Sequence, residues 1–407
     1  MTFDRMRVSN RAVLMPESPI RKLAPYAAEA KKRGIEIYHL NIGQPDIHTP
    51  KPIFEAIKNF SSDILPYGPS QGLIDLRKTI AEYFTRYNID VEPDNVFITT
   101  GGSEAIIFTF MVACDVGDEV LIPEPFYTNY NGFAEMAGVS IIPLSTTVLN
   151  GFRCPSREEI ESKITRRTKA ILVCSPNNPT GTVYSREELE MVASIARKYN
   201  MFILSDEVYR EFTFDNITHT SILHLMDVED RAVIMDSISK RFSACGARIG
   251  FLVSKNKNFI KSVLKLGQAR LCPPTIEQYG AIAGFKMIDN FISDMRRKYE
   301  KRRDIVFEEL NKIEGVYAQK PEGAFYTVTR IPVDDAEDFT KWMLTEFNVD
   351  KKTTMVAPAN GFYATKGKGK DEVRIAFVLK DEDLRDAIKI LKMGIEEYKS
   401  RVNIKES

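Results

Sequence analysis

The sequence predicts an α/β protein built on a mostly parallel β-sheet that helices cover on both faces. Between residues 96 and 236, short β-branched apolar runs alternate with turn residues and helix-like stretches. The runs are almost continuously apolar, which is typical of strands buried on both faces. Of the 407 residues, 43% are hydrophobic and 28% are charged, and a chain of this length and balance can bury a large core.

Six of these apolar runs are predicted strands. In chain order they are Val96–Thr100, Val120–Pro123, Ser140–Leu144, Ala170–Ser175, Phe202–Asp206 and Ala232–Asp236. Two of the intervening helices begin with a Ser-x-x-Glu capping box, in which the serine and glutamate side chains bind backbone amides of the first turn. These boxes are Ser156 with Glu159 and Ser185 with Glu188.

The two ends of the chain have a different pattern. Residues 1–47 are rich in proline and charge and contain no clear strand series. After residue 285, a long charged helix-like stretch precedes two strand-like segments, Ala324–Thr329 and Val373–Val378, and a terminal helix from Glu382 to about Tyr398. We therefore expect two domains, a large one over residues 48–284 and a smaller α+β domain formed by residues 1–47 and 285–407.

Composition and charge exclude several classes of protein. Lys+Arg and Asp+Glu are both 56, so the broad positive field of a nucleic-acid-binding protein is missing. No apolar stretch is long enough for a membrane span, and the first residues contain no apolar secretory signal. The five cysteines are scattered without CxxC spacing and the four histidines form no zinc pattern, so we expect a cytoplasmic protein without a metal site.

In an open parallel sheet, ligands bind beyond the carboxyl ends of the strands, so the residues that follow each strand are informative. After the first predicted strand, Gly101–Ala105 reads GGSEA and opens a helix. Its glycines allow a close backbone approach, and the free amides of a helix start, with the hydroxyl of Ser103, favour an anion. Taken alone, the same residues also describe a tight turn with a serine cap.

Two further strand ends carry polar or aromatic candidates. Tyr127, in PEPFYTNY, can stack on a flat ring, although it could equally be a core aromatic. The segment Ser175–Gly181 reads SPNNPTG, a rigid turn that can direct the amide of Asn178 at a ligand.

The last two strands end in charged residues. Asp206 can meet a cationic ring nitrogen, with Tyr209 three residues on, although a strand-end aspartate is often a helix cap. Lys240 can attack a carbonyl, while Ser237 and Arg248 can bind a phosphate.

Together these positions offer an anion site, a stacking ring, a carboxylate for a ring nitrogen, an amine for an imine and an arginine for a phosphate. The cofactor that requires this combination is pyridoxal 5′-phosphate.

On these motifs the sequence resembles the class I/II aminotransferases, which have fold type I of the pyridoxal-phosphate enzymes, and it is most similar to their aspartate/aromatic aminotransferase-like branch. The resemblance extends from LNIGQPD at Leu40–Asp46 to VRIAFV at Val373–Val378, and SPNNPTG, SDEVY and SISKRFSACGARIG are its specific motifs. It implies a seven-stranded, mostly parallel sheet between helices and a smaller α+β domain.

The resemblance also implies the roles of residues around the cofactor. Lys240 matches the lysine that bonds the cofactor covalently and later moves the proton, and Asp206 matches the carboxylate at the pyridine nitrogen. Tyr209, counted with these two as catalytic, and Asn178 match the groups that bind the 3′-oxygen of the ring. Tyr127 matches the stacking aromatic residue.

The remaining implied contacts concern the phosphate and the substrate. The phosphate contacts are Gly102, Ser103, Ser237 and Arg248, together with Tyr67, which the neighbouring subunit of a homodimer supplies. Arg374 matches the arginine that binds the substrate α-carboxylate, Gly43 matches the loop glycine that closes over it, and Asn178 also lies at the substrate.

The implied activity is ping-pong transfer of an amino group between an L-amino acid and a 2-oxo acid, as in amino-acid biosynthesis. We expect aspartate or a related or aromatic amino acid as donor and 2-oxoglutarate as acceptor. The same scaffold also supports carbon–sulfur β-lyases and aminocyclopropane-type synthases, and a non-catalytic effector sensor is a more distant alternative.

One position departs from the aspartate-specific pattern. Some aspartate-specific relatives carry a lysine where this chain has Ser103. Arg270 and Lys22 are candidates to replace that lysine as the partner of a distal carboxylate.

Overall fold

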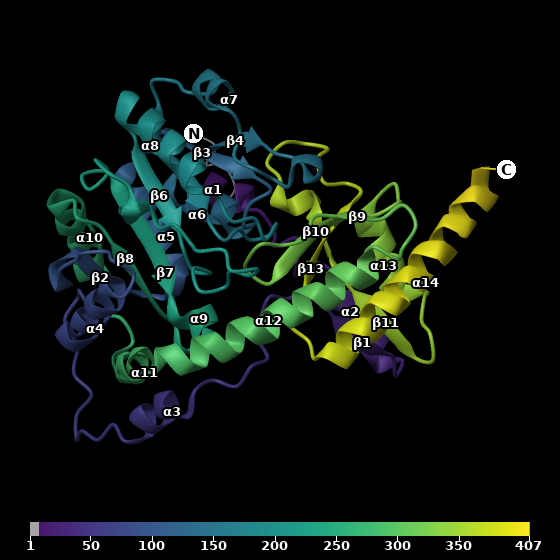
Figure 1. Ribbon diagram of the computed structural model, residues 1–407, viewed down its shortest axis with the longest axis horizontal. Coiled ribbons are helices and arrows are strands. Elements are labelled where there is room, and N and C mark those ends of the chain that lie inside the picture. Colours follow the sequence, from purple (N-terminus) through teal and green to yellow (C-terminus); the bar gives the residue numbers. More distant parts are fainter. Residues whose placement is uncertain (1–7, 407) are drawn as a thin grey trace, which may run out of the picture.

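A seven-stranded sheet forms the centre of the larger part of the molecule in the computed structural model, which describes residues 8–406 (Figure 1). The strands are β2 (Val96–Thr100), β3 (Glu119–Glu124), β4 (Ser140–Ser145), β5 (Thr168–Cys174), β6 (Phe202–Asp206), β7 (Ala232–Ser237) and β8 (Ile249–Val253). Their spatial order is β2-β8-β7-β6-β5-β3-β4, and only β8 runs antiparallel to its neighbours. The predicted mostly parallel sheet is therefore confirmed.

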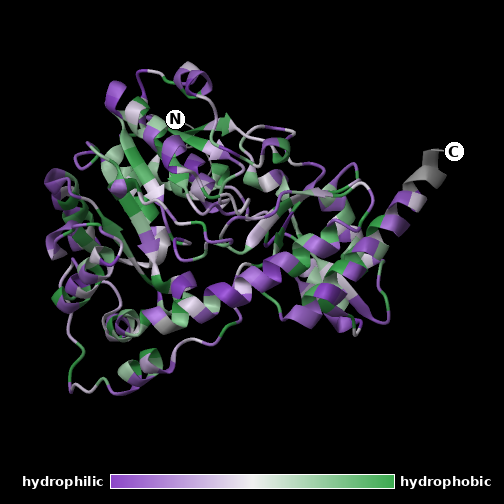
Figure 2. Cartoon of the chain, viewed as in Figure 1, coloured by the Kyte–Doolittle hydropathy of each residue, from purple (hydrophilic) through white to green (hydrophobic). Residues whose placement is uncertain are grey.

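The strands are apolar because both faces of the sheet are covered. Figure 2 shows mostly hydrophobic residues along them. Successive residues of one strand enter different cores: Leu121 packs beneath one face, whereas Val120 and Ile122 pack beneath the other. This alternation between two buried faces explains why the strand sequences are continuously apolar.

Two layers of helices enclose the sheet. The first layer, with α4, α8 and α11, shares one hydrophobic core with the sheet, and α5, α6 and α10 share the other. The helices of this part are α3 (Lys51–Lys58), α4 (Ile74–Thr85), α5 (Gly101–Ala113), α6 (Asn129–Ala137), α7 (Arg157–Ser162), α8 (Arg186–Lys198), α9 (Ile238–Arg241), α10 (Lys257–Arg270) and α11 (Thr275–Lys286).

The remaining elements form a second group around two small sheets. One sheet has the order β12-β13-β10-β9 and is antiparallel, and the other pairs β1 with β11 in parallel. The strands are β1 (Glu36–His39), β9 (Tyr317–Ala318), β10 (Tyr326–Arg330), β11 (Lys352–Met355), β12 (Ala357–Pro358) and β13 (Glu372–Ala376). The helices are α2 (Ala24–Lys32), α12 (Ile288–Leu310), α13 (Ala336–Thr345) and α14 (Asp381–Glu406), whereas α1 (Asn10–Leu14) lies against α6 of the larger part. The N-terminal segment thus joins a sheet with residues more than 300 positions away.

Helix α12 spans the two groups of elements (Figure 1). Its Arg302 binds both carboxylate oxygens of Asp46, at 2.6 and 2.9 Å, and also donates to the carbonyl oxygen of Val378. Asp46 ends the LNIGQPD segment, so this nearly buried arginine fixes a loop that borders the carboxyl ends of the sheet.

Two details of the sequence interpretation are tested directly. Both capping boxes are present, because Ser156 and Ser185 each accept from the backbone amide of the glutamate three residues on, and each glutamate binds back. Residues 1–47 do contain one strand, β1, which the sequence did not indicate.

Within residues 8–406, no helix combines the length and apolar character that a membrane span requires. Over the same residues, no group of three or more His, Cys, Asp or Glu side chains is arranged to hold a metal ion.

Candidate active site

A cavity of about 790 Å³ lies at the carboxyl ends of the central strands. Of the residues predicted to contact the cofactor or the substrate α-carboxylate, all except Tyr67 line it: Gly43, Gly102, Ser103, Tyr127, Asn178, Asp206, Tyr209, Ser237, Lys240, Arg248 and Arg374. They come from five loops of the large sheet, from the LNIGQPD loop and from β13, so the fold brings together residues that are far apart in the sequence.

Lys240 lies on the short helix α9, directly after β7. Ser237 begins this helix, and its hydroxyl accepts from the backbone amide of Ser239 at 3.2 Å. The next residue, Arg241, is fully buried and binds Asp236 at 2.7 Å and Glu211 at 2.6 Å. With this anchor beneath it, the Lys240 amine reaches into the cavity and donates to the carbonyl oxygen of Gly43 at 2.8 Å.

An anion site is formed where α5 begins beside Arg248. Gly101 has φ +74°, and a Cβ atom there would lie 2.2 Å from the Arg248 guanidinium, so only glycine allows this approach. Gly250 lets β8 pack on the same turn, since its Cβ would lie 2.4 Å from the Gly101 carbonyl carbon. The amides that open α5, the Ser103 hydroxyl and the guanidinium then border one corner of the cavity, as a phosphate requires.

Asp206 is a buried carboxylate at the end of β6. Burial raises its pKa to about 6, against the effect of hydrogen bonds from the Tyr130 hydroxyl, at 2.6 Å, and the Val208 amide. Among the described residues no lysine or arginine pairs with it, although it borders the cavity. A cation bound in the cavity would supply the missing partner and favour the ionised form.

Arg374 lies on β13 at the opposite wall. Its Nη1 donates to Asn178 Oδ1 at 3.2 Å and its Nη2 to the Asn41 carbonyl at 2.5 Å. The rings of Tyr326 and Phe362 lie 4.6 and 4.9 Å from the guanidinium. Burial lowers the pKa of Arg374, and its Nε has no hydrogen-bond partner among the described residues. The arrangement leaves a buried, oriented guanidinium for a carboxylate.

Two tyrosines complete the polar walls. The Tyr209 hydroxyl lies 2.9 Å from that of Tyr326, and burial raises its pKa well above its ordinary value. Tyr127 lies at the carboxyl end of β3 and accepts from Asn129 at 2.7 Å, and burial raises its pKa to about 12. Both phenols are therefore neutral hydrogen-bonding groups near pH 7.

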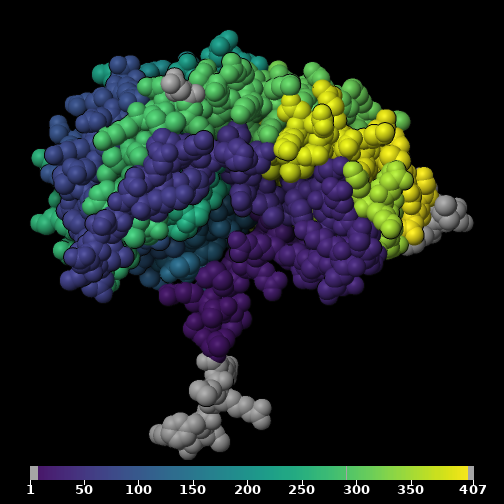
Figure 3. All heavy atoms as spheres, turned by 90° about the horizontal axis from the view of Figure 1, so that it is seen from below, coloured from purple at the N-terminus to yellow at the C-terminus, as the bar shows by residue number. Residues whose placement is uncertain are grey.

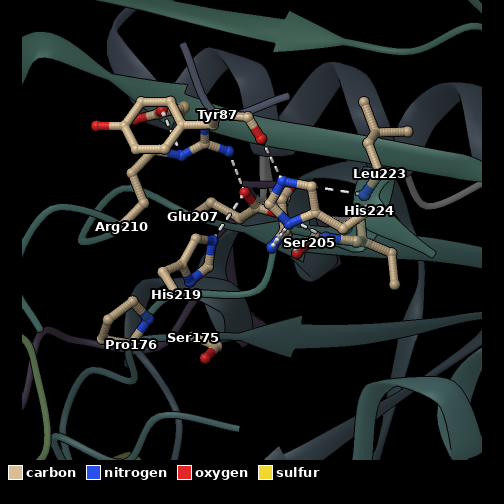
Figure 4. Close-up of polar contacts among 12 residues, drawn as sticks. Tyr87, Ser175, Pro176, Ser205, Glu207, Arg210, His219, Leu223 and His224 are labelled. Atoms are coloured by element: carbon tan, nitrogen blue, oxygen red, sulfur yellow. Dashed lines mark hydrogen bonds and ion pairs between the residues drawn. The ribbon is translucent and has the colours of Figure 1, made fainter. Parts of the chain in front are cut away.

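A second charged residue follows Asp206 but turns away from the cavity. Burial would raise the pKa of Glu207, yet the charge of Arg210 and a contact with His219 at 3.1 Å hold it well below its usual range. Figure 4 shows Arg210, His219 and Ser205 converging on this carboxylate. The cluster holds the backbone between Asp206 and Tyr209 in place.

Three sequence candidates lie outside the cavity. Tyr67 is 78% exposed on the segment before α4. Arg270 faces the carbonyls of Ser70 and Ile98, and Lys22 pairs with Glu337. Neither Arg270 nor Lys22 is therefore positioned to bind a substrate carboxylate in this cavity, because local partners hold both side chains elsewhere.

Several polar residues at the site were missed by the sequence interpretation. They include His39, Asn41, Tyr130 and Tyr326. Two of them carried a signal, since Tyr130 lies three residues after the candidate Tyr127 and Asn41 lies within the LNIGQPD motif. The others lie in segments whose pairing across the chain could not be read from local pattern.

Comparison with known proteins defines the family. The profile of "Aminotransferase class I and II" matches residues 35–391, and the chain belongs to this family. It is 31% identical to an aspartate aminotransferase of Bacillus subtilis (strain 168), covering 97% of this chain and all of that one. It is 33% identical to aromatic-amino-acid aminotransferase 2 of Thermococcus litoralis, with the same coverage.

Comparison with solved structures leads to the same family as the sequence comparison. The crystal structure of aspartate aminotransferase from Thermotoga maritima superposes with a TM-score of 0.88 at 33% identity, covering 96% of this chain and all of that chain. The protein is therefore an aminotransferase that acts on amino-acid and oxo-acid substrates with pyridoxal 5′-phosphate as cofactor, as its sequence predicted.

The described residues fit this cofactor. Asp206 lacks a cation that a protonated pyridine nitrogen would provide, and Gly102, Ser103 and Arg248 border the cavity as donors for a phosphate. The Lys240 amine reaches the same cavity. Each functional group of the cofactor thus has a chemically suitable partner.

Proposed function

We propose that eleven cavity residues and Tyr67 of a neighbouring subunit hold the cofactor and substrate in the roles expected from the sequence. The phosphate would bind Gly102, Ser103, Ser237, Arg248 and Tyr67, and the ring would lie between Tyr127, Asp206, Asn178 and Tyr209. The closeness of Arg248 to Gly101 and the unpaired Asp206 carboxylate support this assignment.

The proposed reaction follows from the placement of three side chains. Arg374, held by Asn178 and two aromatic rings, binds the α-carboxylate and turns the α-carbon towards Lys240. The cofactor, when bound, supplies a carbonyl carbon for imine formation and a ring that withdraws electrons. Asp206 keeps a proton on the ring nitrogen, and the amine of Lys240 removes and returns the α-proton as a general base and acid.

The same residues serve both half-reactions of the ping-pong cycle. We propose aspartate or a related or aromatic amino acid as donor, and 2-oxoglutarate as acceptor. The names of the relatives, aspartate and aromatic-amino-acid aminotransferases, support this choice. No finding favours the carbon–sulfur lyase or the effector sensor.

We further propose a cytoplasmic homodimer that acts in amino-acid biosynthesis. We also propose a division into a large domain, residues 48–284, and a small domain, residues 1–47 and 285–407. The pairing of β1 with β11 supports an N-terminal contribution to the small domain.

The observation that carries the function is the convergence of Lys240, Asp206 and Arg374 on one cavity. The test is a panel of amino acids and 2-oxo acids, followed through the absorbance of the bound cofactor. We expect reversible conversion by a dicarboxylic or aromatic donor and a 2-oxo acid. Release of pyruvate and ammonia without an oxo-acid acceptor would instead identify a lyase.

A further inference from the structure

Part of the cavity is not used by the cofactor or the α-carboxylate. It is bordered by the turn before α2 and by one side of that helix, with Ile20, Arg21, Ala24, Ala27, Ala28 and Lys31. The alanines leave space next to the helix, and this space lies beyond the residues that bind the reacting groups. It is the compartment left for the substrate side chain.

The charge of this compartment is positive. Arg21 and Lys31 are its basic side chains, whereas the acidic residues that line the cavity, Asp206 and Asp236, lie at the ends of β6 and β7. His39 also borders it, but burial lowers its pKa, so this imidazole is neutral near pH 7. An anionic group would therefore be favoured at this end.

Arg21 is exposed at the cavity lining, and the residues on either side of it are fixed. Ile20 packs against the core cluster that contains Phe362, Lys22 pairs with Glu337, and Leu23 is 3% exposed in another core cluster. The flanking side chains are thus fixed to the C-terminal part of the chain. Among the described residues, no hydrogen bond or ion pair engages the Arg21 side chain, so its donors remain available for a ligand.

The turn that carries Arg21 also adjoins the proposed carboxylate arginine. Phe362, which shares a core cluster with Ile20, lies with its ring 4.9 Å from the Arg374 guanidinium. A substrate whose α-carboxylate binds Arg374 and whose α-carbon faces Lys240 has its side chain directed to the rest of the cavity. That remainder includes Arg21.

We propose that Arg21 binds the distal carboxylate of dicarboxylic substrates and so determines side-chain specificity. This inference rests on the proposed function and adds the residue that recognises aspartate, glutamate and 2-oxoglutarate. A guanidinium can bind the carboxylate with two parallel hydrogen bonds, and the adjacent alanines leave room for an uncharged aromatic ring. Lys31 lines the same cavity and adds to its positive charge.

The test compares R21Q with wild type, because glutamine keeps hydrogen-bonding capacity but removes the charge. Half-reaction kinetics are followed by cofactor absorbance with aspartate and glutamate, and in parallel with alanine and phenylalanine. We expect kcat/KM for the acidic pair to fall about 30- to 300-fold and that for the neutral pair to change less than about twofold. R21K should recover part of the loss. K32Q, an equal charge change at an exposed position of α2, is the control.

Equilibrium binding of maleate, an unreactive dicarboxylate, provides a readout without turnover. We expect R21Q to weaken maleate binding and to leave binding of acetate unchanged. Equal losses for acidic and neutral substrates, or unchanged maleate affinity, would overturn the role of Arg21. Wild-type protein that converts no amino acid, but binds maleate through Arg21, would refute the proposed function and leave this assignment standing.

Discussion

The ionised carboxylate of Asp206 destabilises the cofactor-free protein, whereas we expect it to stabilise the cofactor-bound protein. Burial raises its pKa from an ordinary value near 3.8 to about 6. The folded, cofactor-free protein therefore holds the proton more tightly than the unfolded chain. The stabilising contribution of the protonated form is full below pH 4 and is lost as pH rises through 6.

We therefore expect D206N to stabilise the cofactor-free protein above pH 6. Asparagine is neutral at every pH, so the free energy of unfolding should exceed that of wild type by up to about 3 kcal/mol at pH 7.5, and the difference should vanish near pH 4. Urea unfolding at the two pH values measures this difference.

With cofactor bound, wild type should be more stable than D206N, and the half-reactions of D206N should be slower because the proton on the ring nitrogen loses its partner. A pH-independent difference would show that the Asp206 carboxyl is not perturbed.

Tyr130 affects the same carboxylate. Its hydroxyl donates to Asp206 Oδ2 at 2.6 Å and opposes the effect of burial on the pKa. In Y130F the pKa of Asp206 should rise further, so the acidic limb of the pH–rate profile and of cofactor affinity should move to higher pH. Y87F, a tyrosine outside the cavity, is the control. An unmoved acidic limb in Y130F would mean that the hydrogen bond does not tune Asp206.

Arg374 gives a prediction about geometry rather than charge. In R374K the positive charge is kept, but an ammonium cannot reproduce two parallel hydrogen bonds to a carboxylate. We expect kcat/KM to fall for every amino acid by roughly the same factor, about 100-fold, with little change in cofactor affinity. R330K, at an exposed arginine on the neighbouring strand β10 that pairs with Asp371, should have almost no effect. A loss confined to one class of side chain would contradict the α-carboxylate role.

At the scale of elements, the ion pair between α12 and the LNIGQPD loop offers a test of how the cavity is held. D46N removes the charge opposite Arg302, which is nearly buried and would keep the Val378 carbonyl and a 3.9 Å ion pair with Asp381. We expect the free energy of unfolding to fall by about 1–3 kcal/mol and KM to rise, because the same loop carries Gly43.

The matched control is D289N. Asp289 binds Arg86 through both oxygens with similar distances, but this pair is exposed, so the loss should be below about 1 kcal/mol. Urea denaturation and substrate titration measure both variants. Equal losses of unfolding free energy in D46N and D289N would mean that burial of Arg302 does not strengthen its ion pair with Asp46.

The local sequence pattern was sufficient to predict most strands and the edge of the sheet at which the site lies. Val96–Thr100 and Phe202–Asp206 coincide with β2 and β6, because continuous apolar runs between turns have few alternatives. The carboxyl ends of parallel strands share one edge, so the residues after each strand could be expected in one cavity.

Other features depend on pairing across the chain and left no local signal. Strand β8, with the sequence IGFLV, was not among the predicted strands, and its antiparallel direction is invisible in a run buried on both faces. Strand β1 has four residues and pairs with β11, and the contact between Tyr326 and Tyr209 likewise joins distant segments.

At the scale of the whole molecule, several large apolar side chains are exposed on and after α3. Ile64, Leu65 and Tyr67 are 74%, 59% and 78% exposed, and Phe54 of α3 and Tyr279 of α11 are exposed as well. Exposed large apolar side chains favour a protein partner when they gather on one surface. The first described residues also project from the body of the molecule (Figure 3). Both observations support the proposed homodimer.

The shared site can be tested by combining two inactive subunits. K240A removes the amine from its own site, whereas Y67D places a carboxylate beside the phosphate of the site to which Tyr67 contributes. Tyr67 is exposed in the single chain, so Y67D should fold.

If Tyr67 contributes to the site of the opposite subunit, a heterodimer of K240A and Y67D has both substitutions in one site and an intact second site. Purified through two affinity tags, it should have about half of wild-type activity, while both homodimers are inactive. If Tyr67 served its own subunit, each site would carry one lesion, and the heterodimer would be as inactive as its parents. A monomer in sedimentation that is fully active would contradict the shared site independently.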